Sequence, residues 1–454
     1  MAKSLNRRDF LRCSGGLLGA SVLAGCVAQQ PIPVPIPAPA TPAPEAVPTV
    51  SAPAVIKGAT VHFLGYAMFV PKMNEVFQEI ALEWATQNGV KFSWELATTS
   101  DIAARIATAI ETKMGPTIFQ YASPPASWAE GLMDITDLAE EIGSQQEGWY
   151  PTAPAVMTAN NRWFAIPLGT NTPMINWRED WFKEVGFETF PDTWDEVLEA
   201  GKKLKAAGHP FGWVVSGAKA PFDGMACSYV LLWSFGGKEF NEDGTLALDS
   251  SETLDALDFA IKLHEEANDP GAIGYGDASN NNAFLAGQIS MTLNVNTIYL
   301  PALTDAPDVA KAMNHALPPK GPAGRFNYQG YPCVSIPKYV EGRDRDAAIE
   351  FLRHFFSVPV FSKYIKEGKG YLIPQAPIYE NLPIWDPDPK LKLAREIGRI
   401  ARWAGYALPT PSKLSSLMAS QFTISNMFNN AVTNRNPRAA LDATLSEIEQ
   451  LRSQ

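Results

Sequence analysis

The first part of the chain alternates two kinds of apolar spacing. The run "ATVHFLGY" (59–66) is typical of a buried strand, and "KFSWELAT" (91–98) alternates as a half-exposed strand does. Between them apolar residues recur at helical spacing. A second helical stripe begins after Ser100, a predicted N-cap, and stops at Gly115, and residues 117–121 predict a third strand. Strands that alternate with helices in this way predict a parallel α/β sheet.

A second α/β set follows from residue 162. The stretch "RWFAIPLGTNTPMINWRED" (162–180) is two apolar runs bridged by a polar turn, and Thr193 and Glu196 form a capping box for a helix that closes on Gly208. The remaining predicted elements are "FGWVV" (211–215), helices at 225–235 and 251–266, a short helix and a strand in "NNNAFLAGQISMTLNV" (280–295), strands at "HALPPKG" (315–321) and "YPCVSIPK" (331–338), and a mostly helical remainder. We find no internal repeat.

The N-terminus predicts export and lipid anchoring. Arg7 and Arg8 precede a short apolar stretch at 15–25, and this pair resembles the twin-arginine class of bacterial signal. "LAGC" (23–26) resembles the lipobox of bacterial lipoproteins, in which the signal is cut before the cysteine and that cysteine is lipidated. We therefore expect residues 1–25 to be a signal peptide and Cys26 to be the lipid attachment site. The alternative is an ordinary cleaved signal with an incidental cysteine.

The segment after Cys26 is a predicted tether. Residues 26–57 contain nine prolines interleaved with Ala, Val and Ile, a composition that favours extended polyproline II. The predicted location is therefore outside the cell interior, anchored to the outer face of the cytoplasmic membrane, at the cell surface or in the periplasm. No later apolar run approaches the 18 residues of a membrane-spanning helix.

Net charge argues against nucleic acid as a partner. Removal of residues 1–25 takes away four basic residues and one acidic residue, so the net charge moves from −11 to −14. Catalytic and metal-binding patterns are not found. His264 is followed by "EEAND" rather than by a zinc-binding spacing, the five histidines are scattered, and Glu265 and Glu266 are typical of a solvated helix face. The sequence gives no positive reason to expect an enzyme, a metal or a cofactor.

Aromatic and amide residues do collect in loops beside predicted strand ends, which is where open α/β sheets bind ligands. Aromatic faces and amide hydrogen-bonding groups are suited to a polyhydroxylated ring. Trp233 lies in the apolar run "YVLLWSFGG" and fits a core position as well as a ligand contact. The candidate ligand-binding residues are Tyr66, Ser100, Tyr121, Asn171, Phe222, Asp223, Trp233, Asn294, Asn296 and Tyr331.

From residue 59 onward the chain resembles extracellular solute-binding proteins of ABC importers, in the group of maltose- and glycerol-phosphate-binding proteins. The resemblance lies in "NRWFAIPLGTNTPMINWREDWFKEVGFETFPDTWDEVLEAGKKL" (161–204), "AFLAGQISMTLN" (283–294), "YQGYPCVSIPK" (328–338) with "DAAIEFLRHFFS" (346–357), and "GKGYLIPQAP" (368–377). It implies an α/β fold of the periplasmic-binding-protein-like type II class, with two α/β lobes joined by hinge segments.

Carried over by position, the resemblance places crossovers near 167–173, 328–334 and 372–377. Lobe 1 is then 58–169 plus 331–375, and lobe 2 is 170–330 plus 376–454. Cys227 and Cys333 fall in different lobes, where a disulfide would lock the hinge, so both are expected to be reduced. The implied partners are a small solute and the membrane subunits of the importer, and we expect a monomer.

The solute is expected to be a mono- or oligosaccharide. After the "ISMTLN" strand the chain reads "NVNTIY", so amides replace the tryptophan that sugar-binding members generally carry there, and Asn294 and Asn296 are expected to grip hydroxyl groups. A cationic metabolite such as a polyamine is the alternative solute, because Asp223 could pair with its charge and aromatic faces could add cation–π attraction. A surface-anchored glycan-active enzyme and a sensory binding module are the alternatives from other classes, and the enzyme would need a pair of carboxylates in the cleft.

Overall fold

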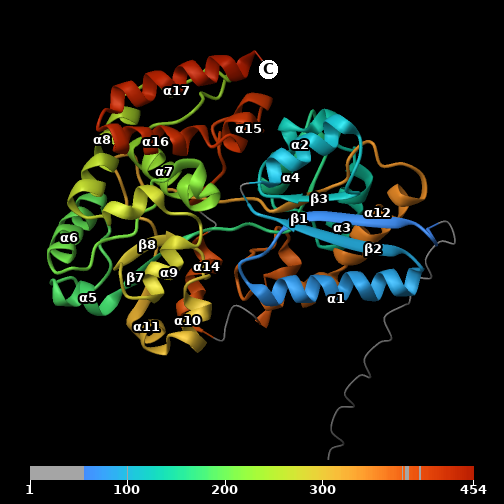
Figure 1. Cartoon of the computed structure of the whole chain (residues 1–454), viewed down its shortest axis with the longest axis horizontal. Helices are drawn as coiled ribbons and strands as arrows, with labels where there is room; N and C mark the ends of the chain where they lie inside the picture. The colour runs from blue at the N-terminus through green and yellow to red at the C-terminus, as the bar shows by residue number, and fades with distance from the viewer. Residues whose placement is uncertain (1–55, 100, 381, 384–387, 398–399, 454) are drawn as a thin grey trace, which may run out of the picture. The chain divides into compact units, whose positions relative to one another are not determined.

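The computed structural model describes residues 56–99, 101–380, 382–383, 388–397 and 400–453 (Figure 1). The predicted signal peptide, the lipid attachment at Cys26, the linker as far as residue 55 and the predicted cap at Ser100 lie outside the described residues. Within the described residues no helix has the combination of length and apolar character that crossing a membrane requires.

The first sheet has five strands in the order β2 (Lys91–Ala97), β1 (Thr60–Tyr66), β3 (Ile118–Tyr121), β11 (Cys333–Ser335) and β6 (Ile166–Pro167). The first three strands are mutually parallel, as the alternation of strands and helices predicts, with Phe63 opposite both Trp94 and Ile118. β11 runs antiparallel to both β3 and β6, so a strand from the last third of the chain completes this sheet.

Helix α1 (Pro71–Asn88) illustrates how local sequence builds this region. Pro71 occupies the first turn, where a missing N–H is tolerated, and Gly89 ends the helix in the left-handed conformation. The buried stripe of Met73, Ile80 and Trp84 faces the first core. α12 (Gly342–Phe355) and α13 (Val358–Gly368) pack against the same helix, so late residues cover β1 as well.

The second sheet is antiparallel, in the order β8 (Met291–Asn294), β7 (Met174–Arg178) and β9 (Met313–Ala316). Its main helices are α6 (Trp194–Ala206), α7 (Pro221–Phe235) and α8 (Ser251–Glu266). Almost every residue of α7 is buried, as expected of a helix surrounded on all sides. The predicted capping box is confirmed, because Thr193 and Glu196 exchange both hydrogen bonds at the start of α6.

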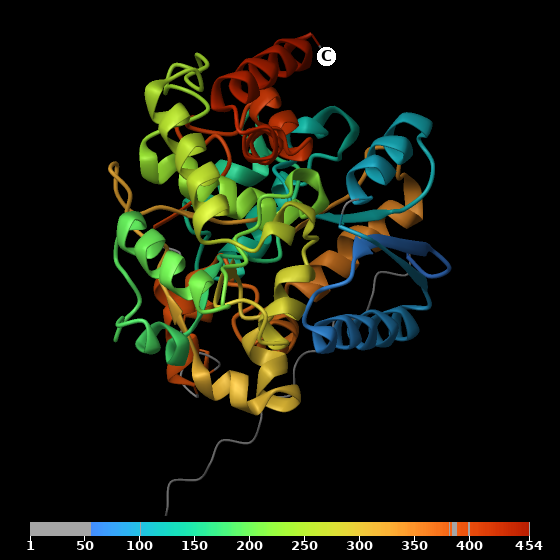
Figure 2. The same ribbon diagram turned by 60° about the vertical axis from the view of Figure 1, so that its left-hand side comes forward.

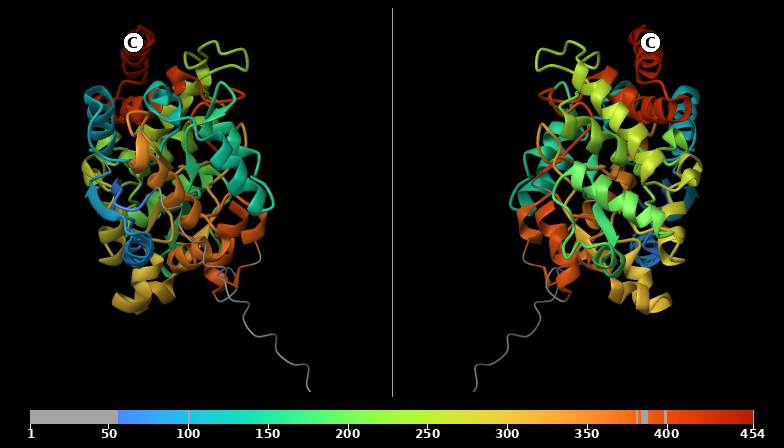
Figure 3. Two further views of the ribbon diagram at one scale, coloured as in Figure 1. Left: turned by 90° about the vertical axis from the view of Figure 1, so that its right-hand side faces the viewer. Right: turned by 90° about the vertical axis from the view of Figure 1, so that its left-hand side faces the viewer.

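The C-terminal helices α16 (Thr423–Asn434) and α17 (Pro437–Arg452) pack on each other and on α8 (Figures 2 and 3). The remaining elements are short. They are β4 (Thr158–Ala159), β5 (Arg162–Trp163), β10 (Asn327–Tyr328), β12 (Ala401–Arg402), α2 (Ile102–Thr112), α3 (Thr136–Gln145), α4 (Thr152–Met157), α5 (Glu179–Glu184), α9 (Ser279–Leu285), α10 (Tyr299–Asp305), α11 (Pro307–Ala312), α14 (Lys392–Ile397) and α15 (Lys413–Ser420).

Three details of the sequence-based prediction are wrong. The run 211–215, through which the second α/β set is expected to continue, forms no strand; Phe211 makes one bridge to Asn268, and the chain leaves the sheet edge after the backbone N–H of Gly212 donates to Met291 O. The strand expected at 315–321 ends at residue 316, because prolines 318 and 319 supply no N–H for a ladder. Helix α2 ends at Thr112, since Lys113 already adopts the left-handed conformation ahead of Gly115.

Three segments that join the two core regions lie side by side. Thr170 and Ile373 exchange backbone hydrogen bonds of 2.9 and 3.0 Å, and Asn171 and Gly330 do the same at 3.0 and 2.9 Å. The Asn171 side chain adds a third link, because its Nδ2 donates to Tyr371 O at 2.8 Å. The backbone contacts fall in the three segments predicted as crossovers, and Tyr371 directly precedes the third segment. The exact division into lobes stays a prediction, and the first core cluster extends to Tyr379.

The two described cysteines lie in different cores. Cys333 belongs to the first hydrophobic cluster and Cys227 to the second, and both are buried free thiols.

Candidate functional site

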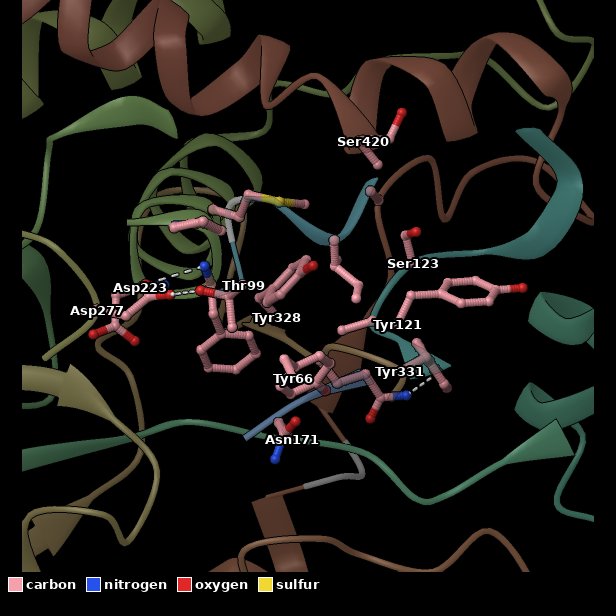
Figure 4. A pocket seen from close by; sticks show the side chains of 18 of the residues that line it. Tyr66, Thr99, Tyr121, Ser123, Asn171, Asp223, Asp277, Tyr328, Tyr331 and Ser420 are labelled. Atoms are coloured by element: carbon pink, nitrogen blue, oxygen red, sulfur yellow. Dashed lines mark hydrogen bonds between the residues drawn. The ribbon is translucent and has the colours of Figure 1, made fainter. Parts of the chain in front are cut away.

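A cavity and its open mouth, together about 1120 Å³, are lined by residues from both core regions. Tyr66 is the last residue of β1, Tyr121 the last of β3 and Asn294 the last of β8, so three strands direct their carboxyl ends toward it. Ser420, at the end of α15, approaches from the opposite side (Figure 4).

Aromatic side chains form most of the wall. Tyr121 and Trp128 meet edge to face with ring centroids 5.0 Å apart, and Phe222 meets Tyr328 at 5.9 Å. Burial raises the pKa of Tyr66 well above its ordinary value, so this phenol stays neutral. The aromatic lining residues are Tyr66, Phe69, Tyr121, Trp128, Phe222, Tyr328, Tyr331, Tyr371, Trp403 and Phe422.

Two carboxylates lie at one end of the cavity, Asp223 in the first turn of α7 and Asp277 in the loop before α9 (Figure 4). Asp277 Oδ1 accepts from the backbone N–H groups of Phe222 and Asp223, both at 3.2 Å, and its Oδ2 accepts from Thr99 Oγ1 at 3.3 Å. Asp277 therefore connects the start of α7 with the loop after β2.

Asp223 is held by neutral amides. Its Oδ2 accepts from Asn280 Nδ2 at 2.8 Å and from Asn294 Nδ2 at 3.1 Å. Asn294 Nδ2 also donates to Asn281 Oδ1 at 2.6 Å, so the amides form a buried network behind the carboxylate. Burial first, and then the negative charge of Asp277, raise the pKa of Asp223 well above its ordinary value. Burial also raises the pKa of Asp277.

Seven predicted site residues line the cavity: Tyr66, Tyr121, Asn171, Phe222, Asp223, Asn294 and Tyr331. Asn171 keeps its Oδ1 without a hydrogen-bond partner among the described residues, whereas Asn294 is engaged by the amide network. Ser100 lies outside the described residues, and its neighbour Thr99 belongs to the lining. Contact of these residues with a solute stays a prediction.

The structure places Trp233 and Asn296 away from the cavity lining. Trp233 is 1% exposed in the second core, and its Nε1 donates to Glu239 Oε2 at 3.1 Å. Trp233 lies on helix α7, which is buried on nearly all sides, so its ring packs in the apolar core and does not reach the cavity. Asn296 is fully buried, and its Nδ2 donates to Lys369 O at 2.7 Å, so it ties two chain segments together.

Sequence reasoning missed Asp277, Ser123, Tyr371, Trp403 and Phe422 as lining residues. Asp277 had a usable signal, since it is an acid in the Gly-rich loop "GYGDASN" directly before the "NNNAFLAG" helix. Trp403 and Phe422 come from the C-terminal part of the chain, for which the sequence predicts no strand end.

Within the described residues no group of three or more His, Cys, Asp or Glu side chains is placed to hold a metal ion.

Comparison with known proteins places the chain in a family. A family model described as bacterial extracellular solute-binding protein matches residues 70–359. A binding protein of Brucella abortus (strain 2308) is 22% identical over 222 residues, which cover 48% of this chain and 52% of that protein. A protein of Deinococcus radiodurans described as "Probable ABC transporter-binding protein" is 24% identical over 200 residues, 42% of this chain and 47% of that protein. The chain thus spans about half the length of the relatives that it matches by sequence.

Solved structures match over most of the chain. Maltose-bound MalE3 of T. maritima has a TM-score of 0.74 and 20% identity, over 87% of this chain and 100% of that one. A sugar transporter of Arthrobacter chlorophenolicus A6 with bound laminaribiose has a TM-score of 0.73 and 20% identity, over 87% and 99%. At these identities the likeness establishes the fold, which is that of the type II periplasmic binding proteins.

Proposed function

Because the chain belongs to the bacterial extracellular solute-binding proteins, we propose that it is the solute-capturing lipoprotein of an ABC importer and that its solute is a mono- or oligosaccharide. The proposed partners are the membrane subunits of that importer. The proposed location is the outer face of the cytoplasmic membrane, through a lipid on Cys26.

The observation that carries the proposal is the composition of the cavity. Aromatic faces such as Tyr66 and Tyr328 suit the apolar faces of a sugar ring, and neutral hydroxyls and amides such as Ser123 and Asn171 suit its hydroxyl groups. The two solved structures compared above hold maltose and laminaribiose, which agrees with this class of solute.

The proposed mechanism is closure without chemistry. Tyr66 and Tyr121 come from the first sheet and Asn294 from the second, so one solute is proposed to contact both. Solute binding then favours the closed arrangement by as much as its affinity differs between the open and the closed states. The three backbone segments around Asn171 are the proposed hinge, and the importer subunits are proposed to recognise the closed form.

The carboxylate pair does not favour glycan hydrolysis. Such hydrolysis needs two carboxyl groups that flank the scissile bond. Asp223 and Asp277 instead lie together at one end of the cavity, where the backbone N–H of Asp223 donates to Asp277 Oδ1 (Figure 4). We therefore propose a receptor rather than an enzyme.

A thermal-shift screen of saccharides tests the proposal. A ligand at 100 times its dissociation constant stabilises the native state by about 2.7 kcal/mol, which gives a clear rise in melting temperature. Mass spectrometry of the recovered saccharide is expected to find it unchanged. Tyr328→Ala is expected to reduce the shift, and Tyr339→Ala, outside the cavity lining, serves as the matched control. A panel in which no saccharide raises the melting temperature contradicts the proposed solute class.

A second experiment tests the anchor. Cys26→Ser is expected to move the protein from the membrane fraction to the soluble extracytoplasmic fraction, because the lipid attachment is lost. Retention of this variant on the membrane contradicts lipid anchoring at Cys26.

A further inference from the structure

The acidic end of the cavity has two carboxylates and no matching cation. The lining contains Asp223 and Asp277 but no Lys, Arg or His. Neither carboxylate forms an ion pair with any described residue. Burial raises the pKa of Tyr331 and the positive charge of Arg402 opposes this rise, but Tyr331 lies at the opposite end of the cavity from the two acids (Figure 4). This end is therefore negatively charged whenever the acids ionise.

The hydrogen bonds within the protein leave one acidic oxygen open. Asp223 is only 2% exposed, and both of its amide donors bind Oδ2. Its Oδ1 has no hydrogen-bond partner among the described residues. Because Asp223 lines the cavity and this oxygen accepts no hydrogen bond from the described residues, a donor group that enters the cavity can pair with it.

We propose that the solute carries a protonated amino group, which donates to Asp223 Oδ1 and is neutralised by the Asp223–Asp277 pair, while the rest of the solute lies between the aromatic walls. This proposal deepens the proposed function and rests on it, since it names an amino sugar as the saccharide. The same protonated amine on a polyamine is the second source of this chemistry.

An amine fits this end better than a hydroxyl group does. A hydroxyl supplies one neutral donor, whereas an ammonium supplies three donors and a full positive charge, and that charge stabilises the ionised form of two adjacent acids. Phe222, which directly precedes Asp223, and Tyr371 both line the cavity together with the two acids. Aromatic rings in the same cavity can add cation–π attraction for an ammonium group. A metal ion is not favoured, because only two acidic ligands meet here.

Isothermal titration calorimetry with matched probes tests the proposal on the mature protein. One set is glucosamine, N-acetylglucosamine and glucose, which differ only in the substituent at C2. A second set is the corresponding β-1,4-linked disaccharides, which differ only at C2 of each ring. Putrescine and spermidine supply the amine without a sugar. The expected result is that an amino sugar binds at least about 30-fold more tightly than its acetylated and hydroxyl analogues, because truncating one partner of a buried charge pair costs at least this much.

Variants locate the effect. Asp223→Asn keeps the shape and removes the charge, and it is expected to abolish the preference for the amine while binding of the neutral analogue is retained. Asp308→Asn removes an exposed acid in α11 and is the charge-matched control, expected to bind as the wild type does. Because Asp223 is buried, Asp277→Asn is the second variant, with the same loss of preference expected.

The outcomes separate the two proposals. Neutral saccharides that bind as well as or better than every amine overturn the inference and leave the proposed function standing. Polyamines that bind when no saccharide does support amine recognition at the acidic pair and overturn the carbohydrate class. A wild-type protein that binds none of the amine probes overturns the inference, and so does an unchanged amine preference in folded Asp223→Asn.

Discussion

Gly330 lies in one of the three segments that join the two core regions, beside Phe222 of the cavity lining. It exchanges backbone hydrogen bonds with Asn171, and a Cβ added to it would lie 2.8 Å from Cε2 and 3.3 Å from Cδ2 of Phe222. Its backbone conformation is not left-handed, so an alanine there is resisted by this close approach and not by torsional strain. Gly330→Ala therefore tests whether the backbone of this proposed hinge segment sets the position of the Phe222 ring.

The magnitude follows from the overlap. Carbon atoms that touch are about 3.5–4.0 Å apart, so the Phe222 ring must retreat by roughly 0.7 Å or more. Overpacking of this kind costs about 1–3 kcal/mol of unfolding free energy. The ring is half-buried and lines the cavity, so its displacement changes the cavity wall. Poorer stacking of the displaced ring on the solute weakens binding by about 0.5–1.5 kcal/mol, or roughly two- to tenfold in Kd.

Urea unfolding and calorimetry with the best saccharide from the screen measure the two effects. Gly274→Ala is the matched control, because nothing lies within 4 Å of its added Cβ. Phe222→Leu gives the methyl group room, so the double variant is expected to recover part of the stability that Gly330→Ala removes. The reasoning is refuted if Gly330→Ala matches the wild type in both measurements, or if the double variant shows no coupling.

Three further predictions concern titration, capping and burial. The acids Asp223 and Asp277 have raised pKa values in the folded state, so they bind more protons there than in the unfolded chain, and their contribution to stability is present at low pH and lost as pH rises through the raised pKa. Tyr371 and Cys227, which interact electrostatically with the acids, also have raised pKa values and stay neutral. Because Asp223→Asn removes one titrating acid, the urea midpoint of this variant should fall less steeply between about pH 4 and pH 8 than that of the wild type. Thr193→Ala removes the capping box of α6 and should lower the unfolding free energy by about 0.5–2 kcal/mol in urea titrations, whereas an unchanged midpoint contradicts this. The Cys227 thiol, whose pKa is raised first by burial and then by Asp223, should resist alkylation in the native protein and react in urea, as peptide mass spectrometry can follow.

Regular elements with strong local signals were predictable from the sequence. The helix 251–266 agrees with α8 at both ends, and the capping box at Thr193 is present, because caps and apolar stripes are local physical properties. The failures at 211–215 and 315–321 have a common cause. A strand exists only if a neighbour accepts its hydrogen bonds, and that neighbour is set by tertiary structure.

The candidate site was predictable where a lining residue ends a strand, as with Tyr66 and Tyr121. Trp233 and Asn296 resemble such residues in sequence, but helix packing and a hydrogen bond to Lys369 O occupy them. Asp277 could not be paired with Asp223 from the sequence, because 53 positions separate them and only the fold brings the loop before α9 to the start of α7.

The position of β11 also constrains the order in which the polypeptide can become a folded protein. This strand separates β3 from β6, although it is made more than 160 residues after β6. A nascent chain that ends anywhere before residue 333 exposes one edge of β3 and one of β6, with no partner for either. Strand β11 is therefore synthesised only after every strand of the second sheet. Until then the first sheet is incomplete, and its exposed strand edges are open to aggregation or to binding by chaperones.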